Sequence, residues 1–256
     1  MRLSLSSPTS GDPIRRDIGP CRGACARPAL CKAATVRVGI LGGTGPLGRG
    51  LAARLAAAGT EVVIGSRQDE RATATAGAIL EAWPGRGLRV TGALNEETAD
   101  TDIVVLAPPW DAAVPTARQL EGRLRGKVVV SVANALVRQG REMHALVPPR
   151  GSLASGVQAA LPASAVAAAG HHLPADTLAD LDARLEADVL VCADDAEAKS
   201  ATMALFTAIE GLRALDAGSL ASASAVEAFT AVLVTLNMRY KGHATLRLRG
   251  VDGTGA

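Results

Sequence analysis

Three glycines spaced as Gly43-x-Gly45-x-x-Gly48 are the residues of this chain with the clearest chemical meaning. They follow the apolar run 36–41 and precede an Ala/Leu/Arg segment with helical spacing that extends to Ala58. A strand–turn–helix unit of this kind brings backbone N–H groups and the positive end of a helix dipole close to a pyrophosphate. We therefore predict a dinucleotide-binding turn, in which Gly43 makes the tight turn, Gly45 lets the backbone approach the phosphates and Gly48 allows close packing of the helix.

The alternative to this prediction is a tight turn that holds no ligand. The full strand–turn–helix setting favours the binding turn. The residues of the turn that we expect to contact the cofactor are Gly43, Thr44, Gly45, Pro46, Leu47 and Gly48.

The end of the second expected strand, 61–65, indicates which dinucleotide binds. Ser66 and Arg67 follow it, about 20 residues after the glycines, where NAD enzymes carry an acidic residue for the ribose 2′-hydroxyl. Arg71 lies one helical turn further on. A hydroxyl and two guanidinium groups can bind a 2′-phosphate, which a carboxylate would repel. We therefore expect NADP rather than NAD; the alternative is that the arginines form only a solvated basic edge.

Apolar strand patterns alternate with helical patterns over residues 36–131, which predicts an α/β fold: a Rossmann-type doubly wound parallel sheet. Ligands of such sheets bind beyond the carboxyl ends of the strands. The expected strands are 36–41, 61–65, 88–91, 102–107 and 127–131, and the expected helices are 46–58, 69–82 and 113–124, with a short helix or loop at 93–101. The cofactor contacts that we expect after the fourth and fifth strands are Ala107, Pro108, Trp110, Ala133 and Asn134.

The later part of the chain departs from this repeat. We expect strands at 165–169, 188–192 and 212–215, and helices at 196–209 and about 220–240. The last helix is apolar enough to span a membrane, but Glu227, Arg239 and many Ser and Thr residues argue against a span. It is therefore expected to be buried, and to be shared between two subunits.

Composition and charge limit the partners. The chain has 256 residues, 48% of them hydrophobic, and a net charge of +2, which gives no sign of a nucleic-acid partner. Residues 1–34 hold six Arg and Lys against two Asp and no hydrophobic period, so we expect a disordered extension, or a true start at a GTG codon for Val36. Cys21, Cys25 and Cys31 lie there without a neighbouring His, so we predict no metal site. We expect a cytoplasmic protein.

Several further segments carry a more specific resemblance. They are Leu41-Gly-Gly-Thr-Gly-Pro-Leu-Gly48, Gly65-Ser-Arg67, Pro109-Trp110, His171-x-x-Pro174-Ala175, Val191-Cys-Ala-Asp-Asp195, Gly211-Leu-Arg-x-Leu-Asp-Ala-Gly218 and Val226-Glu227. In this order they resemble the NADPH:coenzyme F420 oxidoreductase family over nearly all of residues 36–245. The resemblance implies hydride transfer between NADP and the 8-hydroxy-5-deazaflavin coenzyme F420. Residues 1–34 have no counterpart in the family pattern, and 131–136 is shorter and poorer in proline.

The resemblance also implies a division of the chain and roles for single residues. Residues 35–160 would form the NADP-binding Rossmann domain, and 161–256 a small helical or α+β unit for deazaflavin binding and homodimer formation. His171 would hydrogen-bond the deazaflavin, although it could instead cap a loop. Trp110 would either line the deazaflavin pocket or fill the seam between helix and sheet, and Glu227 would pack its helix.

No Ser-His-Asp set, HExxH motif or carboxylate pair is present, and direct transfer between two cofactor rings needs none of these. Two alternatives remain open at this point. One is another NADP-dependent reductase of the same superfamily, acting on an imine, a hydroxy acid or ferric iron; the other is a non-catalytic NADP-sensing protein. Against a hydroxy-acid substrate stands the absence from this sequence of a Lys-x-x-Asn pair on a catalytic helix.

Overall fold

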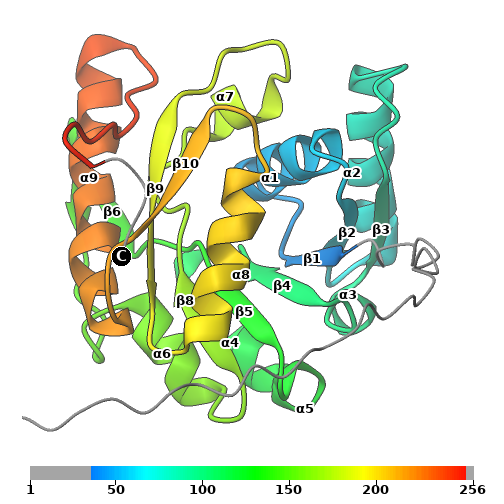
Figure 1. The fold of residues 1–256 in the computed structure, drawn as a ribbon, viewed down its shortest axis with the longest axis horizontal. Helices are drawn as coiled ribbons and strands as arrows, with labels where there is room; N and C mark the ends of the chain where they lie inside the picture. The colour runs from blue at the N-terminus through cyan, green and yellow to red at the C-terminus, as the bar shows by residue number, and fades with distance from the viewer. Residues whose placement is uncertain (1–35, 252–256) are drawn as a thin grey trace, which may run out of the picture. The chain divides into compact units, whose positions relative to one another are not determined.

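An eight-stranded sheet forms the centre of residues 36–251, the part of the chain that the computed structural model describes (Figure 1). Its strands are β1 (Arg37–Leu41), β2 (Glu61–Ser66), β3 (Val90–Leu94), β4 (Ile103–Leu106), β5 (Val128–Ser131), β8 (Ala165–Ala168), β9 (Ala187–Ala193) and β10 (Leu212–Asp216). They lie in the order β10-β9-β8-β5-β4-β1-β2-β3. The expectations for residues 1–34, including the three cysteines, fall outside the described residues.

Helices cover both faces of this sheet (Figure 1). One apolar cluster includes α1 (Pro46–Ala57), α2 (Asp69–Ala82), α7 (Ala175–Ala179) and α8 (Ala196–Thr207). The cluster on the other face includes α4 (Trp110–Gln119), α5 (Glu121–Leu124) and α6 (Leu153–Ala160). The remaining helices are α3 (Asn95–Thr98), the 3-10 turn Leu220–Ser222 and α9 (Ala223–Tyr240).

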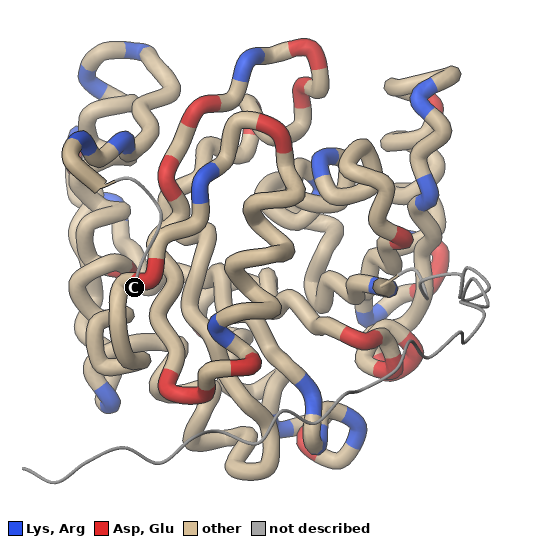
Figure 2. The backbone as a smooth tube through the Cα atoms, viewed as in Figure 1, with Lys and Arg blue, Asp and Glu red and all other residues tan. Residues whose placement is uncertain are grey.

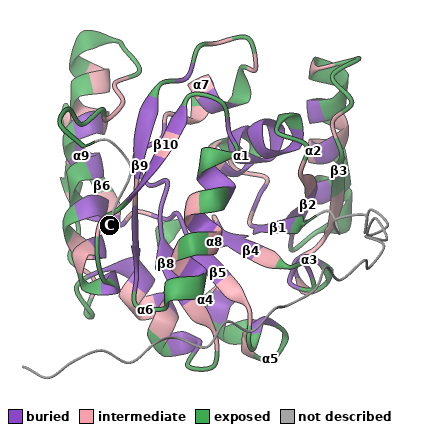
Figure 3. Ribbon diagram, viewed as in Figure 1, coloured by how far each residue is buried: buried purple, intermediate pink, exposed green. Residues whose placement is uncertain are grey.

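The central strands are apolar on both sides because both sides are covered. In β5, Val129 joins the α4–α6 cluster and Val130 joins the α1–α8 cluster, as the alternation of side chains along a strand requires. Strands β4, β5 and β8 carry no charged residue (Figure 2) and are buried along most of their length (Figure 3). The predicted Rossmann-type α/β architecture is confirmed.

The sheet is not parallel at one edge, which the sequence analysis did not predict. β9 pairs antiparallel with β8, and β10 pairs parallel with β9, so the last two strands run against the other six. The chain between β8 and β9 contains only the five-residue helix α7, which packs on α1. Arg54 of α1 holds it there by donating hydrogen bonds to the carbonyl oxygens of Thr177 (2.8 Å) and Leu178 (3.1 Å). No helix crosses the sheet between these strands, as a parallel pair would need.

The same sheet runs across the boundary that we expected at residue 160. β8 pairs parallel with β5, from Val128 opposite Ala165 to Ser131 opposite Ala168. The described residues 36–251 all belong to one contact unit. The later strands therefore extend the nucleotide-binding sheet.

A small hairpin that the sequence analysis did not predict packs on the last helix. Strands β6 (Leu136–Gln139) and β7 (Glu142–Ala145) are joined at Gly140, whose φ of 61° favours glycine. The backbone N–H of Met143 donates to Thr235 Oγ1 at 2.9 Å, and Glu142 pairs with Arg239. By length and composition alone, the described segment Leu220–Tyr240 could cross a membrane.

Candidate active site

The carboxyl ends of the parallel strands are aligned in one row. Leu41 lies opposite Leu106, Leu106 opposite Ser131, and Ser131 opposite Ala168. The segments that follow these residues therefore meet at one edge of the sheet. With about 4.8 Å between neighbouring strands, the edge from β8 to β2 spans about 19 Å. An extended dinucleotide matches such a row of loops.

The glycine turn at the end of β1 owes its shape to contacts that exclude a side chain. Gly42 has a φ of 67°, and a Cβ there would stand 2.8 Å from the Pro108 backbone. A Cβ on Gly48 would stand 2.6 Å from the Gly43 Cα. The left-handed residue of the tight turn is thus Gly42, and not Gly43 as predicted. Gly43 is required because a Cβ there would stand 2.7 Å from the Ile40 carbonyl oxygen.

The N-terminus of α1 is open toward this edge. Gly45 is its N-cap, no side chain caps the helix, and Pro46 occupies the first turn. A Cβ added to Gly45 would meet no heavy atom closer than 4.0 Å, so the space beside it is free. The first turn also contains no acidic residue. The unsatisfied N–H groups and the helix dipole can therefore bind a phosphate.

The end of β2 presents the predicted basic pair. Arg67 and Arg71 are exposed, and neither guanidinium group has a hydrogen bond or ion pair in the described part of the structure. Ser66 is buried and its Oγ accepts a hydrogen bond from the N–H of Gln68 at 3.2 Å. Asp69 and Glu70 follow in the first turn of α2. The two guanidinium groups are available to an anionic ligand.

Asn95 positions the glycine turn and was missed in the sequence. Its Oδ1 accepts a hydrogen bond from the N–H of Gly42 at 3.4 Å and lies 2.7 Å from where a Cβ of Gly65 would stand. The residue is buried at the start of α3. An Asn in a segment with little periodicity gives no local signal; its role depends on the pairing of β1, β2 and β3.

The loops after β4 and β5 lie beside the glycine turn. The N–H of Ala107 donates to the Leu41 carbonyl at 2.9 Å, and the N–H of Val132 donates to the Leu106 carbonyl at 3.3 Å. These bonds continue the sheet pairing past the strand ends and bring the predicted segments 107–110 and 132–134 together. Trp110 begins α4 and its residue surface is 42% exposed. It therefore does not fill the seam between helix and sheet.

Buried polar atoms without partners gather where β5 and β8 end. Ser131 Oγ, Asn134 Oδ1 and both ring nitrogens of His171 are buried and have no hydrogen bond among the described residues. Asn134 Nδ2 donates to the His171 carbonyl oxygen at 2.8 Å, which ties the two loops together. Burial, together with the neighbouring His172, lowers the pKa of His171 to about 3, so its imidazole is neutral at pH 7. A neutral imidazole offers one N–H donor and one acceptor.

His172 belongs to a structural network. Its Nε2 donates to the Asp188 carbonyl oxygen at 2.6 Å. The fully buried Asp188 carboxylate accepts two hydrogen bonds from Arg213, at 2.8 and 2.7 Å, and one from the Leu248 N–H at 2.6 Å. Burial alone would raise the pKa of Asp188, but these donors together with Arg247 lower it overall. The network fixes β9 and the C-terminal segment beneath the histidine pair.

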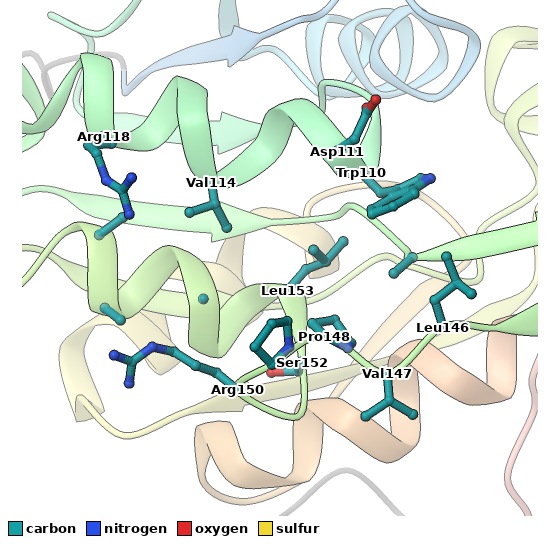
Figure 4. Close-up of a pocket in the computed structure, with 15 residues that line it drawn as sticks. Trp110, Asp111, Val114, Arg118, Leu146, Val147, Pro148, Arg150, Ser152 and Leu153 are labelled. Carbon is teal, nitrogen blue, oxygen red and sulfur yellow. The ribbon is translucent and has the colours of Figure 1, made fainter.

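A pocket of about 490 Å³ opens beside Trp110 (Figure 4). It lies between α4 and α6 and is closed by the loop 146–152 that follows the hairpin. Trp110 and Ala135 connect it to the loops after β4 and β5, whereas His171 is not among its lining residues. Among the described residues no group of three or more His, Cys, Asp or Glu could hold a metal ion.

The comparisons with known proteins agree with this geometry. Residues 37–135 match the family model described as NADP oxidoreductase, coenzyme F420-dependent. An F420-dependent NADP reductase of Methanocaldococcus jannaschii is 38% identical over 215 residues, which cover 82% of this chain and 96% of that protein. The chain belongs to the F420-dependent NADP reductase family. The suggested resemblance is confirmed.

One further relative and one solved structure are also similar to this chain. The metalloreductase STEAP3 of Rattus norvegicus is 33% identical over 192 residues, but these cover only 36% of that protein against 75% of this chain. A crystal structure of a protein from Arthrobacter sp. FB24, described as a candidate F420-dependent NADP reductase, has a TM-score of 0.70. It is 24% identical and covers 84% of this chain and all of its own, which shows the shared fold.

Proposed function

We propose that this protein transfers a hydride between NADP(H) and the deazaflavin coenzyme F420, as the names of its relatives state for them. The single observation that supports this most strongly is the row of aligned strand ends. It carries an open helix N-terminus, two arginines whose guanidinium groups have no partner among the described residues, and a buried polar cluster. The ferric alternative has less support, because the chain matches only about a third of the metalloreductase. No observation favours the imine, hydroxy-acid or sensing alternatives.

NADP would be held along the row from β2 to β5. The N–H groups at Gly45–Leu47 would bind the pyrophosphate, with Thr44 and Gly48 shaping the turn, and Ser66, Arg67 and Arg71 would bind the 2′-phosphate. The backbone at Ala107–Pro108 and Ala133–Asn134 would border the nicotinamide. The nicotinamide and deazaflavin rings supply the redox chemistry when bound.

The chain's own contribution to the transfer is orientation, water exclusion and hydrogen bonding. His171 would donate its N–H to the deazaflavin, whose ring gains electron density when it is reduced. Because burial keeps this imidazole neutral, it would stabilise that charge as a hydrogen-bond donor and would not deliver a proton. Its low exposure requires that the surrounding loops open for this contact.

The test is turnover of purified protein with NADPH and F420, followed by loss of deazaflavin absorbance. Deuteride on the transferring face of NADPH should appear on the deazaflavin with little exchange with solvent. A His171→Ala variant should be slower, and should keep part of its activity. Absence of F420 turnover would refute the proposed function, and full washout of the label would refute direct transfer.

We also propose that the protein is a homodimer joined through α9. Its exposed side carries Phe229, Val232, Leu236 and Tyr240, between 37% and 79% exposed and spaced along one helix face. Its other side packs on β7 and α6, and Glu227 there accepts hydrogen bonds from the N–H groups of Leu153 (2.8 Å) and Ala154 (3.0 Å). A second copy would cover the apolar face. Light scattering should give a dimer that Val232→Glu converts to a monomer, and a monomeric wild type would contradict the proposal.

We also propose that the protein works in the cytoplasm and has neither a membrane nor a nucleic-acid partner. The packing of α9 supports this proposal. Glu227 and the Arg239–Glu142 pair attach α9 to the folded body, although its length and composition would permit a span. The net charge of +2 gives little attraction for a polyanion. Cell fractionation should recover the protein in the soluble fraction.

A further inference from the structure

The pocket beside Trp110 has a feature that the hydride transfer does not use. Two arginines, Arg118 on α4 and Arg150 in the loop before α6, line the end away from Trp110 (Figure 4). Both are exposed, and neither guanidinium group has a hydrogen bond or ion pair in the described part of the chain. An apolar cavity that ends at two free guanidinium groups fits an elongated ligand with an apolar part and an anionic part.

We propose that Arg118 and Arg150 bind the anionic tail of the deazaflavin coenzyme, its phosphodiester and glutamyl carboxylates. This inference rests on the proposed function. It assigns the tail to the groove between α4 and α6, with the ring toward Trp110 and Ala135 at the strand ends. From Trp110 to Arg118 is eight residues of helix, about 12 Å. The groove therefore leads from the site of hydride transfer to the two charges.

Other charged groups around the pocket do not compete with this assignment. Asp111 is the one carboxylate in its lining, and Figure 4 shows its side chain turned away from the cavity. The N-terminus of α6 is already satisfied: Glu227 accepts from two of its N–H groups, and Ser152 Oγ accepts from Ser155 at 3.0 Å. The groups in this groove that can donate hydrogen bonds to an anion are thus the two arginine side chains.

Two prolines restrict the loop that holds Arg150: Pro148 and Pro149 directly precede it. A guanidinium on such a loop loses less conformational freedom when it binds an anion than one on an unrestricted segment. Arg118 is held by α4. The two charges flank the open end of the groove from different elements, so a ligand with several anionic groups can contact both.

The experiment measures binding to the NADP-loaded full-length protein by deazaflavin fluorescence, with two probes. One is coenzyme F420, and the other is the same ring with its ribityl chain but without phosphate and glutamate. For the Arg118→Gln/Arg150→Gln double variant, we expect the Kd of F420 to rise roughly tenfold to a hundredfold, and that of the tailless probe to stay unchanged. Wild-type F420 affinity should also fall with salt, as a charge-dependent contact requires.

Arg141→Gln is the matched control, because Arg141 lies exposed in the hairpin turn outside the pocket, and its guanidinium has no partner among the described residues. It should change neither Kd. An unchanged F420 affinity in the double variant would overturn the inference and leave the proposed function standing. Equal weakening of both probes would also overturn it, since the arginines would then act on the pocket as a whole. If wild type bound neither probe, the proposed function and this inference would fail together.

Discussion

The two ends of the sheet differ in the kind of group that forms the candidate site. At β1–α1–β2 the site is made of backbone: glycines that admit no side chain, an uncapped helix and two arginines in solvent. At β8–β9 it is made of buried side chains: His171, His172 and Asp188 are each less than 5% exposed. The first design depends on sterics within a few residues. The second depends on partners far apart in sequence, which must all be in place before the polar groups can be buried.

This difference predicts what substitutions at each end do to binding and to stability. Changes in the glycine turn should abolish nucleotide binding while much of the fold persists. Changes in the buried network should lower stability first, and should affect binding through the loss of folded protein. Four substitutions or conditions test this contrast, from the largest expected effect to the smallest.

Gly48→Ala should have the largest effect on nucleotide binding. The new Cβ would stand 2.6 Å from Gly43 Cα and 2.7 Å from its carbonyl oxygen, and backbone atoms cannot rotate away as a side chain would. The turn must shift, at a cost of about 1–3 kcal/mol in stability. We expect NADPH affinity, measured by titration, to fall by at least roughly a hundredfold, equivalent to about 2.7 kcal/mol.

Gly77→Ala gives the matched control for this substitution. Gly77 lies inside α2, and a Cβ there would meet nothing within 4 Å. The change should stabilise the protein by roughly 0.5–1 kcal/mol and leave NADPH binding intact. If both variants bound NADPH like wild type, the close contact at Gly48 would have no role in the site.

Asp188→Asn tests the other end of the sheet. It leaves Arg213 without its buried carboxylate partner, and breaking such a pair costs about 3–5 kcal/mol. Urea unfolding should show this loss. Asp216→Asn removes the partner of Lys199. Because Asp216 is much more exposed than Asp188, this change should cost less than about 1 kcal/mol. Equal losses in the two variants would mean that burial at Asp188 adds nothing.

The contrast also explains what could be predicted from the sequence. The glycine turn and the strand–helix alternation up to Ser131 depend on local pattern, and the expected α2 range, 69–82, matches the structure to the residue. Asn95, the β6–β7 hairpin and the reversal of β9 were missed. Their placement depends on long-range contacts: Asn95 on the Gly42 turn, the hairpin on α9, and β9 on the packing of α7 against α1.

The pocket was only partly predictable for the same reason. Trp110 stood out as an aromatic residue after a strand, with two possible roles. Arg118 and Arg150 are separated by 31 intervening residues that include a strand, a hairpin and a proline loop. No local pattern brings the two arginines together, because their proximity comes from the packing of α4 on α6.

Arg67→Ala should sharpen the contrast at the nucleotide end without affecting the fold. A charge-assisted hydrogen bond contributes about 1.5–3 kcal/mol, so the KM for NADPH should rise roughly 10- to 150-fold. NADH lacks the 2′-phosphate, and its KM should change little. Because Arg67 is exposed and unpartnered among the described residues, the melting temperature should also stay constant. Equal effects on the two cofactors would contradict the assignment of Arg67 to the 2′-phosphate.

The pH dependence of stability is the last test; its effect is the smallest near neutral pH, and it separates the two ends without a change of the site. Burial lowers the pKa of His171 from its ordinary value of 6.5 to about 3, so between these values the unfolded chain binds a proton that the folded chain does not. Stability should therefore fall as the pH drops from about 6.5 toward 3, by up to about 1.4 kcal/mol per pH unit for this group. His172, whose pKa burial also lowers, acts in the same direction. His171→Gln should flatten the curve of unfolding free energy against pH in this range, whereas Arg67→Ala should leave its shape unchanged. Parallel curves for wild type and His171→Gln would show that His171 is solvated in the folded protein. They would contradict the buried polar cluster at the end of β8.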